Sequence, residues 1–142
     1  MADIRHSLQI AASPEAIAPL VSTLHGLAQW WAEDVTEIDG CAELGFFNRT
    51  TVYRLRPQAG DPPRRYEWLC ETGQEWSGTR LVFELQTAGS GTQLRFTHAG
   101  WESESDYFIS CTTTWGELMF RLKGAAEGKP RGPLFLRESL AY

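Results

Sequence analysis

His98 is the residue of this sequence best placed to do chemistry. It lies in residues 92–98, a stretch that reads as a β-strand, where Leu94, Phe96 and His98 share one face by alternation. An imidazole on that apolar face can exchange one hydrogen bond with a ligand carbonyl or hydroxyl. It can equally serve the fold alone, bonded to a backbone carbonyl near Gly100. Either role predicts a pKa below the usual value of about 6.5, because desolvation disfavours the charged ring.

The other reactive side chains do not combine into a catalytic or metal site. No serine stands in the Gly-x-Ser-x-Gly turn of a nucleophile elbow. Cys41, Cys70 and Cys111 lack metal-ligand spacing and read as reduced thiols, which is typical of a cytosolic protein. Cys111 lies on an apolar helical face, where a thiol packs as a small hydrophobic group with a high pKa. We therefore predict no catalytic residue, no metal and no cofactor.

A long amphipathic helix is predicted from about residue 103 to residue 125. Its apolar face recurs every three or four residues and consists of Phe108, Cys111, Trp115, Met119 and Leu122. Ser103 with Asp106 forms a weak capping box at its start, and Gly124 and Gly128 end it.

Most of the chain before this helix alternates with period two, which predicts an antiparallel meander. The expected strands are residues 3–11, 35–39, 43–49, 51–56, 65–71, 79–87 and 92–98. Turn residues separate them, and residues 58–63 are expected to form the longest loop of the sheet.

Two short helices are expected between the first two strands. Ser13 and Pro14 begin one of them, which Pro19 interrupts before about Leu24. Residues 25–32 suggest a second, on which His25 faces solvent. This helix ends in Trp30 and Trp31, and adjacent helical residues do not share a face, so one Trp is expected to be buried and the other exposed.

These elements predict an α+β fold in which a curved seven-stranded antiparallel sheet grips a long C-terminal helix. Residues 1–142 fit one domain. The extension 128–142 carries Leu134, Phe135, Leu136 and Leu140, too apolar for a solvated tail, so it should pack on the body or on a partner. If the sheet and helix do not close completely, a cavity remains between them.

Charge and composition exclude several function classes. The net charge is −5, and no cluster of lysine or arginine exceeds Arg64-Arg65, which argues against nucleic-acid binding. Polar residues near the N-terminus argue against a signal peptide, and no apolar run is long enough for membrane insertion. A cytoplasmic location follows as an expectation.

At this point the sequence resembles the START-like or SRPBCC superfamily, also called helix-grip. The likeness is greatest to its subgroup related to the activator of the heat-shock ATPase. It covers nearly the whole chain to about residue 125. The matching pieces are Ile4 to Pro14, Trp30-Trp31, Trp68-Leu-Cys70, Glu75-Trp-Ser-Gly-Thr79, Phe83-Glu-Leu85, Phe96-Thr-His-Ala-Gly-Trp101, and Trp115 with Leu118 and Leu122. The resemblance implies the fold but no single activity, since its members include lipid carriers, cyclases, receptors and chaperone regulators.

Three functions remain open. The first is binding or carriage of a small hydrophobic, flat or lipid-like ligand in the cavity. The second is a cyclase or dehydratase that uses His98 or a tyrosine as acid–base. The third is a chaperone-regulator type of protein-interaction module, and a homodimer is possible in any of them. The residues predicted to contact a ligand are Trp31, Tyr66, Trp68, Phe83, Phe96, His98, Phe108, Thr112, Trp115 and Met119.

Overall fold

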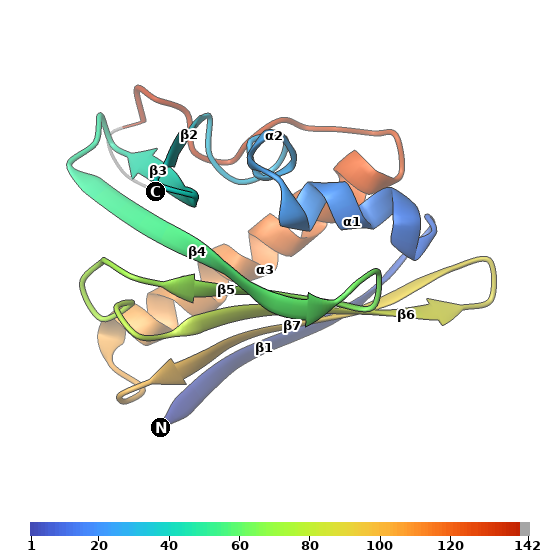
Figure 1. The fold of residues 1–142 in the computed structure, drawn as a ribbon, viewed down its shortest axis with the longest axis horizontal. Coiled ribbons are helices and arrows are strands. Elements are labelled where there is room, and N and C mark those ends of the chain that lie inside the picture. The colour runs from blue at the N-terminus through green and yellow to red at the C-terminus, as the bar shows by residue number, and fades with distance from the viewer. Residues whose placement is uncertain (140–142) are drawn as a thin grey trace.

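The computed structural model describes residues 1–139 and is built on one seven-stranded antiparallel sheet of order β1-β7-β6-β5-β4-β3-β2. The strands are β1 (Ala2–Ile10), β2 (Asp34–Ile38), β3 (Cys41–Phe46), β4 (Thr51–Asp61), β5 (Arg65–Cys70), β6 (Arg80–Ala88) and β7 (Gly91–Trp101). The helices are α1 (Pro14–Ser22), α2 (Leu24–Leu27) and α3 (Asp106–Ala126). Figure 1 shows the sheet curving around α3, with α1 and α2 beside it. This confirms the predicted helix-grip fold.

The long helix α3 buries the stripe that its sequence predicted. All five residues of the stripe are buried, and Leu118 joins them. The helix begins slightly later than expected, because Ser105 rather than Ser103 is the N-cap. Its hydroxyl accepts a hydrogen bond from the backbone N–H of Phe108 at 3.2 Å, which satisfies one of the free donors of the first turn.

The expectation of one buried and one exposed tryptophan in the Trp30–Trp31 pair is wrong. Helix α2 ends at Leu27, so the pair lies in a turn, where helical geometry no longer sends neighbours to opposite sides. Both rings are buried and stack with centroids 5.8 Å apart. The Trp30 indole N–H donates to the backbone carbonyl of Leu20 at 2.9 Å, which provides the partner that a buried indole needs.

The expected loop at residues 58–63 is mostly strand. Strand β4 continues to Asp61, which pairs with Arg65 across an irregularity in the ladder, so only residues 62–64 form the turn. Gly60 signals a close backbone approach here rather than a turn. A Cβ atom at this position would lie 2.4 Å from the carbonyl oxygen of Arg65, so a side chain would separate the two strands.

The C-terminal tail runs back along the body, over α2 and β2 (Figure 1). The backbone N–H of Phe135 donates to the carbonyl of Trp31 at 3.0 Å, and its carbonyl accepts from the N–H of Glu33 at 2.9 Å. Phe135 is buried, whereas Leu136 is half exposed. Leu140, the last apolar residue of the predicted extension, lies outside the described residues.

The sheet's inner face follows the predicted alternation. Leu81, Phe83 and Leu85 on β6 are buried, as are Leu94 and Phe96 on β7.

Within the part of the chain that the structure describes, no helix is long and apolar enough to cross a membrane.

Candidate functional site

His98 is buried, as predicted, but both of its ring nitrogens are engaged within the protein. The indole N–H of Trp115 donates to Nδ1 at 3.1 Å, so Nδ1 carries no proton. The neutral ring then has its proton on Nε2, which donates to the hydroxyl oxygen of Thr79 at 2.8 Å. The Thr79 hydroxyl in turn donates to the backbone carbonyl of Trp76 at 2.5 Å. These hydrogen bonds join α3, β7 and the loop that precedes β6.

Burial lowers the pKa of His98 to about 3, which confirms the predicted direction. The partners differ from the expected backbone carbonyl near Gly100, because the ring lies between Thr79 and Trp115 instead. A neutral ring with both nitrogens in use has no site left for a ligand hydrogen bond. His98 therefore has a structural position in this fold.

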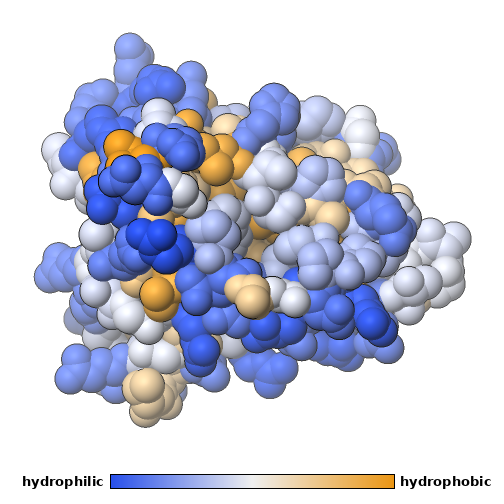
Figure 2. All heavy atoms as spheres, in the orientation of Figure 1, coloured by the Kyte–Doolittle hydropathy of each residue, from blue (hydrophilic) through white to orange (hydrophobic). Residues whose placement is uncertain are grey.

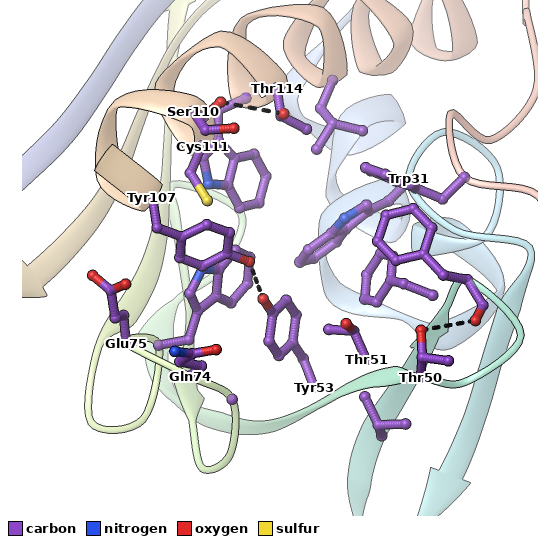
Figure 3. A pocket seen from close by; sticks show the side chains of 18 residues that line it. Trp31, Thr50, Thr51, Tyr53, Gln74, Glu75, Tyr107, Ser110, Cys111 and Thr114 are labelled. Carbon is purple, nitrogen blue, oxygen red and sulfur yellow. Dashed lines mark hydrogen bonds between the residues drawn. The ribbon is translucent and has the colours of Figure 1, made fainter. Parts of the chain in front are cut away.

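A pocket of about 610 Å³ opens between α3 and the β3–β4 side of the sheet. Its lining consists of Trp31, Phe46, Phe47, Thr50, Thr51, Val52, Tyr53, Gly73, Gln74, Glu75, Trp76, Tyr107, Ser110, Cys111, Thr114, Trp115, Leu118 and Phe135. The volume lies within the range of small-molecule sites. Aromatic rings form one part of the lining, and polar side chains such as Thr51, Gln74 and Ser110 form another. Figure 3 shows the labelled side chains arranged around this space.

The asymmetric position of α3 leaves room for the pocket. Among the strands, the helix backbone approaches β1 most extensively, at one edge of the sheet. Strands β2 and β3 form the opposite edge, so the space between that edge and α3 is bridged by side chains rather than by backbone packing. The tail closes one end of this space with Phe135, whose ring meets that of Phe46 edge-on at 5.1 Å.

Two tyrosines meet across the pocket. Tyr53 comes from β4 and Tyr107 from the first turn of α3, and their hydroxyl groups are hydrogen-bonded to each other (Figure 3). Burial raises the pKa of Tyr53 to about 12, and burial and the bond to Tyr53 raise the pKa of Tyr107. Both are therefore neutral phenols. One O–H is used between them, so the pair keeps one O–H and several lone pairs for a ligand.

Stacked aromatic rings hold Tyr53 in place. Its ring lies parallel to that of Trp76, with centroids 4.1 Å apart. Trp76 stacks in turn near Trp115 at 6.0 Å, and Trp31 meets Trp115 at 5.0 Å. Gly73 permits the first stack, because a Cβ atom there would lie 2.5 Å from the Tyr53 ring. The residue has φ +116°, which also favours glycine.

Polar groups lie at the rim and on one wall. The Cys111 thiol interacts with the Trp76 indole and with the Tyr107 hydroxyl, and burial raises its pKa, so it is protonated. Among residues 1–139, the Trp76 indole N–H has no oxygen or nitrogen acceptor. Glu75 lies at the rim, where its carboxylate accepts a hydrogen bond from the Ser105 hydroxyl, the cap of α3.

The structure brings together only part of the predicted contact set. Trp31 and Trp115 line the pocket. The other eight, Tyr66, Trp68, Phe83, Phe96, His98, Phe108, Thr112 and Met119, lie outside its lining. Several of them fill the core instead; the Trp68 indole, for example, donates to the backbone carbonyl of Val21 at 2.8 Å.

The strongest polar features of the pocket were missed from the sequence, although signals existed. Tyr53 alternates with Leu55 on the inward face of β4, and both are buried. Tyr107 precedes Cys111 by one helical turn at the edge of the apolar stripe. The apolar tail marked Phe135 as a packing residue, but its place at this pocket depends on the course of the tail, which no local pattern gives.

Metal binding has no obvious place in the described structure. Among residues 1–139, no three or more His, Cys, Asp or Glu side chains gather as a metal ion would require. The acidic residues nearest the sheet edge are engaged with arginines: Arg49 pairs with Asp34 at 2.9 Å and also with Glu43.

Comparison with known proteins agrees with this architecture. Residues 11–127 match the family model described as "Activator of Hsp90 ATPase homolog 1-like protein". The chain belongs to this family. The resemblance found in the sequence is thereby confirmed. Among curated proteins, none matches the chain closely enough to count.

Solved structures extend the comparison. The solution structure of the Aha1 dimer from Colwellia psychrerythraea is 28% identical, with a TM-score of 0.80, and the match covers 91% of this chain and 98% of that one. Protein MLL2253 from Mesorhizobium loti is 14% identical with a TM-score of 0.73, covering 86% and 94%. CalU16 from Micromonospora echinospora is 17% identical with a TM-score of 0.72, covering 93% and 69%. The last two share the fold alone.

Proposed function

We propose that this protein binds a small, mainly hydrophobic molecule in the pocket between α3 and the β3–β4 side of the sheet. The observation that supports the proposal is the pocket of about 610 Å³, whose 18 lining residues include eight aromatic ones. Rings of this size supply a large apolar contact area at low cost in side-chain entropy. The tyrosine pair supplies a polar anchor that a ligand carbonyl or hydroxyl can use.

The proposed ligand contacts therefore lie between α3 and the β3–β4 side of the sheet, and His98 is not among them. Trp31 and Trp115 remain in the contact set, and Tyr53, Trp76 and Tyr107 join it. A catalytic function has weaker support, because both ring nitrogens of His98 are hydrogen-bonded, to Thr79 and to Trp115. Both tyrosines also have raised pKa values, which makes them poor bases near neutral pH.

Binding of the neutral dye Nile red tests this proposal. The wild type should bind it with blue-shifted emission. Ser110→Phe places a ring in the pocket from α3 and should weaken binding by about tenfold. Thr113→Phe is the matched control, since Thr113 is exposed on the same helix and is not among the lining residues. Equal loss in both variants, or no binding by the wild type, would contradict the proposal.

Family membership favours a second candidate, a protein-interaction module of the chaperone-regulator type. Two large apolar side chains of α3 face solvent: Ile109 is 58% exposed and Phe120 is 60% exposed. Such residues can contact a protein partner or a second copy of the chain. We infer that Phe120→Ser, but not Ser110→Phe, would reduce any stimulation of an Hsp90-type ATPase. Sedimentation of the wild type and Phe120→Ser reports on a homodimer in the same experiment.

A further inference from the structure

The charge of the pocket is one-sided. Among the described residues that line it, Glu75 carries a formal charge, and no lysine, arginine or histidine occurs. The nearest arginines in sequence, Arg49 beside Thr50 and Arg54 beside Tyr53, both pair with the carboxylate of Glu43 instead. A ligand in the pocket therefore meets a carboxylate without a compensating cation.

The effect of Glu75 reaches the interior of the pocket. Its negative charge contributes to raising the pKa of Tyr53 and of Cys111, although burial is the main cause for both groups. The Ser105 hydroxyl occupies one oxygen of the carboxylate. An ionised carboxylate has about four lone-pair sites, so it can accept further hydrogen bonds from a ligand.

The aromatic rings that line the pocket also favour a cation. The face of an aromatic ring carries negative charge density and attracts a cation, with Trp the strongest and Tyr next. Trp31, Trp76 and Trp115 line the pocket together with the tyrosine pair. Figure 3 shows Tyr53, Tyr107 and Trp31 on different sides of the space, with Glu75 beside Tyr107.

The N-terminus of α3 is the feature that would favour an anion, because a helix start carries a partial positive charge. Here that end is already compensated. Ser105 caps it and accepts from the Phe108 N–H, Asp106 lies in its first turn, and Glu75 contacts the cap. The surface seen in Figure 2 is mostly hydrophilic, with apolar residues gathered around β2, β3 and the tail, and the net charge is −5, which also attracts cations over a distance.

We propose that the pocket prefers a ligand in which a protonated or quaternary amine is attached to an apolar ring. The ring packs among the tryptophans, and the amine lies between the tyrosine pair and Glu75. This inference rests on the proposed ligand-binding function, and it names the chemical class of the ligand. It adds a selectivity to that function: cation over neutral molecule, and neutral molecule over anion.

Three probes of one shape test the preference by calorimetric titration: naphthylmethylammonium, naphthylmethanol and naphthoate. The ammonium should bind about fivefold more tightly than the alcohol, and the naphthoate most weakly. Glu75→Gln should remove most of the ammonium's advantage and leave the affinity for the alcohol unchanged. Added salt should reduce the same advantage. Glu84→Gln, an equal change of charge at an exposed position of β6 outside the lining, is the control.

The outcomes distinguish failure of the preference for a cation from failure of the ligand-binding proposal on which it rests. If none of the three probes binds, the ligand-binding proposal itself fails. If the alcohol and the ammonium bind equally and Glu75→Gln changes neither, ligand binding stands and the preference for a cation is overturned. If naphthoate binds most tightly, the helix start outweighs Glu75 and the preference is reversed. Unchanged affinity of Glu75→Gln for the alcohol shows that this variant is folded.

Discussion

Acid should destabilise this protein through His98, because the folded state holds its imidazole neutral. The pKa is about 3 in the folded protein, where the ring is bonded to Thr79 and Trp115, and about 6.5 in an unfolded chain. Between these values the unfolded state binds the extra proton. The stabilisation is therefore complete above about pH 6.5 and is lost as the pH falls toward about 3.

The size of the loss follows from the same two pKa values. Lowering the pH from about 7.5 to about 5 should cost the folded state about 2 kcal/mol through His98 alone. His6 also has a pKa lowered by burial, and carboxylates add their own terms, so the total slope is not specific to His98. The informative quantity is the loss of unfolding free energy between the two pH values, compared between the wild type and His98→Gln. The glutamine cannot titrate but keeps a donor for Thr79.

Urea unfolding followed by tryptophan fluorescence at a series of pH values provides the measurement. His98→Gln should be less stable at neutral pH, because the Trp115 indole loses its acceptor. It should also lose about 2 kcal/mol less than the wild type between the two pH values. If both proteins lose stability in parallel, the imidazole is not held neutral, and the hydrogen-bond chain from Trp115 through Thr79 is wrong.

Three further changes test two packing contacts of the pocket and one ion pair at the sheet edge, each by the free energy of unfolding in urea. Gly73→Ala should cost about 1–2 kcal/mol, since the residue has φ +116° and its Cβ would meet the Tyr53 ring; no loss would show that the loop relaxes freely. Phe135→Ala should cost about 3 kcal/mol, because a buried ring is removed; a negligible loss would mean that the tail does not hold its place. Arg49→Gln should cost only about 1 kcal/mol and less at high salt, since Arg49 is partly exposed and Asp34 keeps Arg137 at 3.4 Å.

Periodicity in the chain was enough to predict the elements and their inward faces. The stripe of α3 and the alternation of β6 and β7 are local properties, because helix and strand geometry set which residues share a face. The inward position of His98 and the lowered pKa followed from the same alternation and from desolvation. The N-cap of α3, by contrast, was predicted at Ser103 and lies at Ser105, two residues later. Both serines can cap a helix with the same hydroxyl, so the sequence does not distinguish them.

The location of the pocket could not be read in this way. It depends on α3 lying near β1, so that space remains on the β3–β4 side, and on the tail returning Phe135 to close one end. The hydroxyl contact between Tyr53 and Tyr107 joins residues more than fifty positions apart. Such contacts arise from the packing of whole elements against one another, and no local pattern encodes which distant side chain each residue meets.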